Sequence, residues 1–288
     1  MMPCKRAALL LPPAILLLAV GAACLPSPDE PIDYVRRENA VIIQLKNVQE
    51  LGNPSDVSLR MMDRLTIPAF TLYGDGTLLF TRVDDTGQEQ LIIATLPEEA
   101  ILDLVQFIVD EGFLEFTYEQ PRPAAPGPPP LTTFLYVNTK DGTNATRAQD
   151  LSAGSLDGAS SDYTEFRRLI KIKERLESLD LLALGGTVSG AFAPKAALLV
   201  VVPFRGESPT SPGAWLYPEI DLDEIAPPGV EFGERIITRD EVPDLFADLF
   251  FDELQIISQV IQFGEQLFVV GVRPALPFDE NFPEFDQP

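Results

Sequence analysis

The amino-acid sequence predicts an α+β protein, with mostly antiparallel sheets packed against a few helices and arranged in two α+β parts. Two pairs of β-type segments flank short turns, Gly74-Asp75-Gly76 and Asp141-Gly142, and Asp-Gly turns are typical of antiparallel hairpins. Helical patterns follow these hairpins in blocks and do not alternate with single strands, which favours α+β over α/β. An apolar fraction of 45%, with 18 Phe, provides enough surface for a folded core.

The first residues have the pattern of an export signal. Lys5 and Arg6 form a short positive segment, and the uncharged Ala7–Ala23 is short for a membrane-spanning helix. The small residues at 21–23, directly before Cys24, resemble the bacterial lipobox, in which this cysteine is acylated, although Gly21 stands where an aliphatic residue is usual. We therefore expect an extracytoplasmic protein that is lipid-anchored to the cell membrane through Cys24. Simple secretion and an uncleaved anchor are the alternatives.

Composition changes along the chain suggest its domain organisation. The expected segments are a signal peptide at 1–23, a tether at 24–39, an N-terminal α+β domain at 40–182, a C-terminal α+β domain at 190–277 and a flexible acidic tail at 278–288. The glycine-rich residues 183–190 between the two domains are interpreted as a hinge or turn.

The elements of the first part follow from its hydrophobic pattern. The expected strands are Ala40–Leu45, Thr66–Tyr73, Thr77–Val83, Leu91–Ala94, Thr132–Thr139 and Thr143–Gln149. Gly74-Asp75-Gly76 is expected to be an exposed hairpin tip, and Asp141-Gly142 a second turn of the same chemistry. A helix should begin with Pro97 in its first turn and end before Gly112. A second helix, Tyr163–Leu179, should start with a capping box of Asp162 and Glu165.

The second part has fewer but equally clear patterns. Ala196–Phe204 (AALLVVVPF), Gln255–Phe263 and Gln266–Val272 are expected strands. Thr238 with Glu241 predicts the start of a helix from Val242 to about Phe251.

The chain is strongly acidic, with a formal net charge of −23. Nucleic acid and anionic lipid headgroups should repel such a chain, so no nucleic-acid partner is expected. We interpret the acidic residues mainly as a solvated surface. The more specific alternative is that they recruit cations or a basic partner.

Three short patterns resemble parts of a family of uncharacterised exported lipoproteins from actinobacteria and Chloroflexi. They are the hairpin pattern P-x-F-x-L-Y-G-D-G at Pro68–Gly76, the W-x-x-P pattern at Trp215–Pro218, and Arg273–Pro277. The family has no known activity. The resemblance therefore implies an exported location and this fold class, and no reaction.

Residues for the common catalytic sites are missing from the sequence. The chain has no histidine and no nucleophile or nucleotide-binding motif, which excludes Ser-His-Asp and Cys-His nucleophilic sites and histidine-ligated zinc. Its two cysteines, Cys4 and Cys24, lie in or beside the signal and leave no disulfide for the body. A pair of carboxylates, as in glycosidases, remains possible among 44 acidic residues.

A few residues are candidate ligand contacts. Asp75 could contact a ligand, although its position favours a turn former, and Trp215 with Tyr217 could form a platform for a sugar or peptide, although buried anchors are more common. The acidic run at Asp221, Asp223 and Glu224 could bind Ca²⁺ but lacks the EF-hand spacing, so a solvated loop is favoured and no metal or other cofactor is expected.

Two functions from different classes remain. The first is a non-catalytic protein that binds an extracytoplasmic protein or glycan, or has a structural role in the envelope. The alternative is a carboxylate-dependent hydrolase acting on glycans. Because histidine and nucleophile motifs are missing, the sequence favours the non-catalytic role, without deciding whether the protein is an enzyme.

Overall fold

The computed structural model describes residues 32–49, 56–83, 86–116, 131–149, 151, 164–206, 211–248, 257–277 and 279. The described residues from Ile32 onward belong to one compact unit. They form two sheets with five α-helices, so the predicted α+β class with largely antiparallel sheets is confirmed. The predictions for Cys24, for the Asp162 cap and for most of the acidic tail lie outside the described residues.

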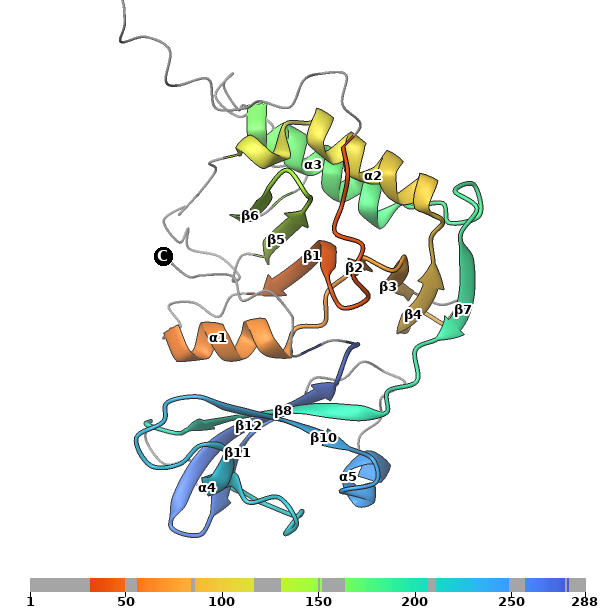
Figure 1. Cartoon of the computed structure of the whole chain (residues 1–288). Helices are drawn as coiled ribbons and strands as arrows, with labels where there is room; N and C mark the ends of the chain where they lie inside the picture. The colour runs from red at the N-terminus through yellow and green to blue at the C-terminus, as the bar shows by residue number, and fades with distance from the viewer. Residues whose placement is uncertain are drawn as a thin grey trace, which may run out of the picture. The chain divides into compact units, whose positions relative to one another are not determined.

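The first sheet has seven strands in the order β6-β5-β1-β2-β3-β4-β7, and every neighbouring pair is antiparallel (Figure 1). Its strands are β1 (Val41–Gln49), β2 (Phe70–Tyr73), β3 (Thr77–Val83), β4 (Glu89–Thr95), β5 (Leu131–Asn138), β6 (Thr143–Gln149) and β7 (Thr187–Ala191). Alternate residues of a strand face opposite sides of a sheet. In β1, Ile43 and Leu45 join the main hydrophobic core, while Lys46 on the other side bonds to α1.

Helices α2 (Glu98–Asp110) and α3 (Thr164–Glu177) cover one face of this sheet, as Figure 1 shows. One face of α2 is apolar, and its Ile101, Leu104 and Ile108 are buried in the core with strand residues. Pro97 precedes the helix as its N-cap, with an extended ψ of 154°. The helix therefore begins at Glu98, one residue after the proline that was expected to be its first residue. Gly112 ends the turn with a φ of +78°, and a 3₁₀-helix, η1 (Phe113–Glu115), follows.

The β2–β3 hairpin is confirmed, but its tip is not exposed as a whole. Gly76 has a φ of +87°, and Asp75 is exposed and accepts a hydrogen bond from the Thr77 N–H at 2.9 Å. Gly74 and Gly76 are buried instead, because the backbone carbonyls of Val35 and Leu96 lie against them. Any side chain at these two glycines would collide with those carbonyls.

The β5–β6 hairpin is confirmed with a different turn chemistry. Gly142 does not have positive φ. The Thr139 hydroxyl instead accepts hydrogen bonds from the Asp141 and Gly142 N–H groups, at 3.2 and 3.1 Å. The expectation that both turns share one chemistry was therefore wrong, since a threonine side chain organises the second.

The second sheet has five strands in the order β10-β8-β12-β11-β9. They are β8 (Ala196–Pro203), β9 (Gly213–Ala214), β10 (Gly233–Thr238), β11 (Ile257–Phe263) and β12 (Gln266–Pro274), with the short helices α4 (Leu222–Ile225) and α5 (Pro243–Asp248). All pairs are antiparallel except β11 with β9. A separate hydrophobic cluster packs the sheet against both helices.

Helix α1 (Asp56–Leu65) was not predicted, although it connects the two sheets. It contacts β8 and β12, and its Met61 and Leu65 pack with Leu198 and Val200. A β-carbon on Gly271 of β12 would lie 2.2 Å from Leu65 Cδ1. Glycine at 271 is therefore what permits the close approach of α1.

Residues 183–190 are only partly the expected turn. Gly185 has a φ of +71°, but Thr187 onward forms strand β7 at the edge of the first sheet. Within the described residues, no helix has both the length and the apolar character needed to cross a membrane.

Candidate functional site

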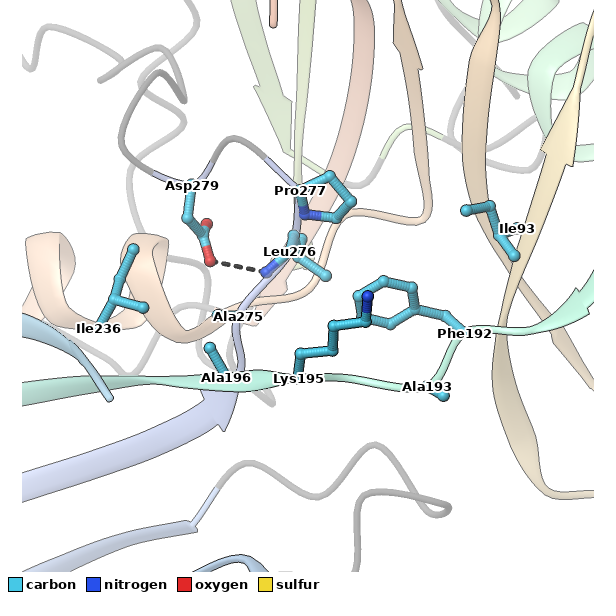
Figure 2. Close-up of a pocket in the computed structure, with 10 residues that line it drawn as sticks. All are labelled: Ile93, Phe192, Ala193, Lys195, Ala196, Ile236, Ala275, Leu276, Pro277 and Asp279. Atoms are coloured by element: carbon cyan, nitrogen blue, oxygen red, sulfur yellow. Dashed lines mark hydrogen bonds between the residues drawn. The ribbon is translucent and has the colours of Figure 1, made fainter. Parts of the chain in front are cut away.

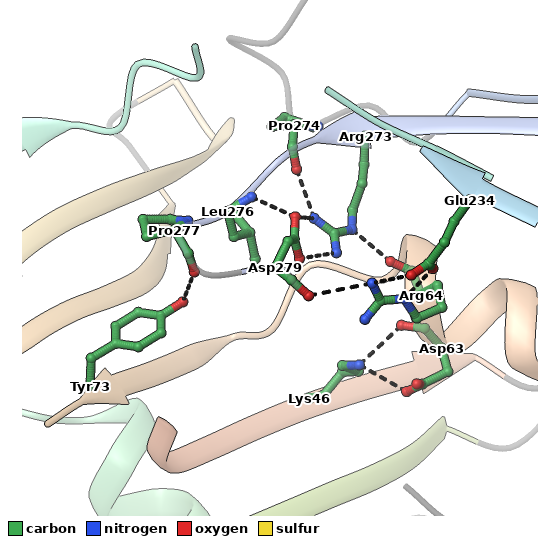
Figure 3. A network of polar contacts seen from close by, with 10 residues as sticks. All are labelled: Lys46, Asp63, Arg64, Tyr73, Glu234, Arg273, Pro274, Leu276, Pro277 and Asp279. Atoms are coloured by element: carbon green, nitrogen blue, oxygen red, sulfur yellow. Dashed lines mark hydrogen bonds and ion pairs between the residues drawn. The ribbon is translucent and has the colours of Figure 1, made fainter. Parts of the chain in front are cut away.

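A cluster of charged side chains lies where α1, the first sheet and the second sheet meet. We call it the junction network; its members are Lys46, Asp63, Arg64, Glu234, Arg273 and Asp279, shown in Figure 3. The members come from β1, α1, β10, β12 and the segment after β12. Segments far apart in the sequence thus supply one polar site.

Arg273 and Asp279 form the most buried pair of the network. Their side chains are 2% and 0% exposed, and the two Arg273–Asp279 contacts, Nη1–Oδ2 and Nη2–Oδ1, measure 2.9 and 2.7 Å. Arg273 also donates to the carbonyls of Arg64 and Pro274, and Asp279 accepts from the Leu276 N–H at 2.8 Å. Two parallel N–H···O bonds of this kind fix the relative orientation of the guanidinium and the carboxylate.

Two further ion pairs anchor α1. Arg64 donates to Glu234 of the second sheet through Nε at 2.8 Å and Nη2 at 3.1 Å. Lys46 of the first sheet donates to the Asp63 carboxylate at 2.8 Å and to the Asp63 carbonyl at 3.0 Å. Burial lowers the pKa of Lys46, and the charge of Asp63 opposes this shift.

Tyr73 connects the end of β2 to the segment after β12. Its hydroxyl donates to the Pro277 carbonyl at 2.7 Å, and burial raises the pKa of this phenol. Tyr73 is fully buried, with Leu276 in the same apolar cluster. The segment after β12 is therefore attached to the first sheet by a hydrogen bond and by apolar contact.

Gln44 of β1 is a buried polar residue whose amide has no partner among the described residues. It is 0% exposed, and within that part of the chain neither Oε1 nor Nε2 has a hydrogen bond. An unsatisfied buried amide costs about 1–3 kcal/mol. Gln44 is therefore a local source of instability in the centre of the first sheet.

A cavity of about 520 Å³ lies beside the junction network (Figure 2). Its lining comes from β4, the segment between β7 and β8, the start of β8, β10 and the segment after β12: Ile93, Phe192, Ala193, Lys195, Ala196, Ile236, Ala275, Leu276, Pro277 and Asp279. Most of these side chains are apolar. In the view of Figure 2, Lys195 extends from the segment before β8 toward Phe192 and Leu276.

The two charged side chains of this cavity differ in availability. Both carboxylate oxygens of Asp279 are already bonded to Arg273, and one also to the Leu276 N–H. The Lys195 side chain is exposed and makes no hydrogen bond or ion pair with any described residue. The arrangement therefore offers apolar walls and one available positive charge, which suits binding of a ligand.

A smaller cavity of about 330 Å³ is lined by two carboxylates, Glu89 and Glu177. Glu177 is ion-paired to Lys173 at 2.7 Å and lies 3.5 Å from the Asn47 amide nitrogen. Glycosidases of the two-carboxylate type need one of the pair protonated at the start of the reaction. In this cavity one Glu177 oxygen is already paired with Lys173 and the other with the Asn47 amide.

The sequence-predicted contact residues lie apart from these cavities. Asp75 bonds its own turn through Thr77. Trp215 and Tyr217 contact each other edge to face, with ring centroids 5.1 Å apart, and both pack against the core of the second sheet. The Trp215 Nε1–H donates to the Ile220 carbonyl at 3.0 Å.

The acidic run that was considered for Ca²⁺ organises a helix start. Asp221 caps α4 by accepting from the Asp223 and Glu224 N–H groups at 2.9 and 3.3 Å. Asp223 accepts from the Gln266 amide at 3.1 Å. No three carboxylates or other common ligand side chains gather for a metal ion in the described ranges.

No pattern in the sequence predicted Lys195, Arg273 or Asp279 as site residues. A partial signal was present, because Arg273 follows the apolar run of β12 (QLFVVGV) and an arginine there must be paired if the strand is buried. The partner could not be predicted, since Asp279 is one of 44 acidic residues.

No protein-family model matches the chain, and neither does any curated protein or solved structure. A function must therefore be inferred from the residues of the chain itself.

Proposed function

We propose that this chain is an exported, membrane-anchored lipoprotein with a non-catalytic function, binding a ligand through its extracytoplasmic fold. The proposed location rests on the positive Lys5 and Arg6, the uncharged Ala7–Ala23 and the cysteine at 24. The resemblance of Pro68–Gly76 to exported lipoproteins is a further argument for it.

The observation that carries the binding role is the cavity beside the junction network. Small-molecule sites typically have volumes of about 300–1,000 Å³ and mostly apolar walls with a few polar groups. The cavity has this size and composition. Its lining carboxylate, Asp279, has no oxygen free to exchange a proton with a substrate, so general acid–base chemistry has no support there.

Acylation at Cys24 can be tested by metabolic labelling with a fatty-acid analogue. The wild-type chain should be labelled and should remain with the membrane fraction. The Cys24→Ser variant should lose the label. Equal labelling of both chains would disprove the proposed anchor.

Ligand binding in the cavity can be tested with Nile red, a neutral dye that fluoresces in apolar surroundings. Saturable fluorescence is expected for the wild type. Ala193→Trp should fill the mouth of the cavity and reduce the signal strongly. Ala214→Trp, at an exposed position of β9 outside the cavity lining, is the matched control and should keep it. Equal dye binding by all three chains would mean that the cavity is not the binding site.

A carboxylate-dependent glycan hydrolase is the second candidate, because Glu89 and Glu177 line one cavity. If it is correct, the wild type should release reducing sugars from a cell-envelope glycan. Glu89→Gln should then lose most of that activity, whereas Glu115→Gln, outside the cavity lining, should keep it. We expect no release above buffer from any of the chains.

A further inference from the structure

We infer that the cavity beside the junction network binds an amphipathic organic anion, whose acidic group pairs with Lys195 while its apolar body lies along Phe192 and Leu276. This inference rests on the proposed binding function and adds the chemical class of the ligand. Three features of the described residues lead to it: the charge around Lys195, its ammonium group that the fold does not use, and the composition of the walls.

The first feature is the placement of positive charge. The Lys195 side chain lines the apolar cavity and also an adjoining cavity of about 440 Å³, where Arg239 and Asp240 are further lining residues. The Arg239 N–H donates to the Lys195 carbonyl at 3.1 Å, which holds the two residues side by side. Lys195 and Arg239 thus line the adjoining cavity together with one carboxylate, Asp240, in a chain whose net charge is −23.

The second feature is that Lys195 is not used by the fold. Lys46 and Lys140 have carboxylate partners, and so do Lys171 and Lys173. The Lys195 ammonium has none among the described residues. A lysine that lies over an apolar wall with its charge free can pair with the acidic group of a ligand while its alkyl chain contacts the ligand's apolar part.

The apolar walls define the other end of the ligand. Ile93, Phe192 and Leu276 come from three different segments and line the same space. A purely polar anion would leave these side chains in contact with water. An alkyl or aryl body covers these side chains, and the binding gains in proportion to the apolar area removed from water.

A free amphiphile fits better than a lipid in an anionic bilayer. The acidic surface of the chain repels anionic headgroups, and this repulsion opposes close approach to such a membrane. Decanoate, decanol and decylammonium share one alkyl chain and differ in charge, so they serve as probes of the site.

The inference is tested by calorimetric titration of the full chain with each probe, below the concentrations at which they form micelles. Decanoate should bind roughly tenfold more tightly than decanol, because its carboxylate can accept a charge-assisted hydrogen bond from Lys195, and decylammonium should bind least. Lys195→Met should remove the advantage of decanoate and leave decanol binding unchanged. Lys195→Arg should keep the advantage, and so should the control Lys171→Met, which removes an exposed lysine of α3.

The outcomes separate the inference from the proposed function. Equal affinity for decanoate and decanol, or undiminished decanoate binding by Lys195→Met, would overturn the assigned ligand class while Nile red binding supports the cavity. Lack of any alkyl ligand binding, together with Nile red fluorescence that Ala193→Trp does not change, would overturn both. The melting temperatures of the Lys195 variants show whether they fold. If Lys195→Met is unstable, the affinities of Lys195→Arg for decanoate and decanol still test the inference.

Discussion

At the scale of single residues, Gln44 is a polar side chain at a fully buried strand position. The sequence around it, AVIIQL, predicts a strand, and β1 has this residue fully buried in the middle of the seven-stranded sheet. Its amide has four hydrogen-bonding positions, and no described residue is a partner for either heavy atom. Removing the amide should therefore relieve an unfavourable interaction.

We predict that Gln44→Leu stabilises the protein by about 1 kcal/mol, because leucine has a similar volume and leaves no unsatisfied polar group. For a protein of this size that corresponds to a rise of roughly 2–4 °C in melting temperature. Gln259→Leu, at an exposed position of β11, is the control and should have little effect. A fall in the melting temperature of Gln44→Leu would mean that the amide has a stabilising partner, such as an internal water.

Asp75 illustrates a residue whose sequence interpretation and contacts agree. Its position between two glycines predicted a turn former, and its carboxylate accepts hydrogen bonds from the Thr77 N–H and hydroxyl. Such bonds follow from the local chain alone, because the partners are two residues apart.

At the scale of elements, one glycine on each side of β3 has nearly the same positive φ in different surroundings. Gly76 has a φ of +87° and Gly87 a φ of +85°. A β-carbon at Gly76 would lie 2.6 Å from the Leu96 carbonyl, whereas one at Gly87 would have nothing within 4 Å. The pair therefore separates conformational strain from a steric clash.

We predict that Gly87→Ala destabilises the protein by about 1 kcal/mol, the usual cost of a positive φ for an L-residue. Gly76→Ala should cost clearly more, because it also pushes the Leu96 carbonyl away from its place beside the hairpin. Urea denaturation of the two variants measures the difference. Equal losses would show that the contact with Leu96 relaxes without cost.

Helix α1 could have been found from its own pattern. Val57, Met61 and Leu65 recur every four residues, which is the spacing of one helical face. The segment is only 10 residues long and has a negative mean hydropathy, so its pattern is weak alone. Its stability in the fold comes from packing between two sheets, as is usual for short helices.

At the scale of the whole molecule, the buried ion pair of Arg273 with Asp279 joins α1, β12 and the segment that follows β12. Loss of one partner from a buried pair leaves the other charge without compensation and typically costs about 3–5 kcal/mol. Replacing both partners by apolar residues of similar volume is often neutral or stabilising.

We therefore predict that Arg273→Met lowers the unfolding free energy by about 3 kcal/mol or more. Addition of Asp279→Leu should restore much of the loss, because no buried charge then remains. Arg205→Met, which removes an exposed arginine paired with Glu231, is the control and should cost less than about 1 kcal/mol. If the double variant is no more stable than Arg273→Met, the hydrogen bonds of Arg273 to the Arg64 and Pro274 carbonyls account for most of the lost unfolding free energy.

The sequence by itself determined the α+β class, both hairpins, α2 and most strands of the two sheets. These features depend on short-range properties: alternation of side chains, the periodicity of helices and the positive φ of Gly76, all readable within about ten residues. The predicted export signal and Cys24 anchor belong to the same local kind of pattern, and they stay predictions until the labelling experiment is done.

Only the tertiary structure decided the order of the strands, the docking of α1 and the composition of the candidate site. Arg64 and Glu234 are 170 residues apart in sequence, and Tyr73 and Pro277 are 204 apart. With 44 acidic residues, no local rule selects which carboxylate pairs with a given cation. The selection follows from which segments pack together, because burial makes a pair necessary and packing leaves one carboxylate within reach.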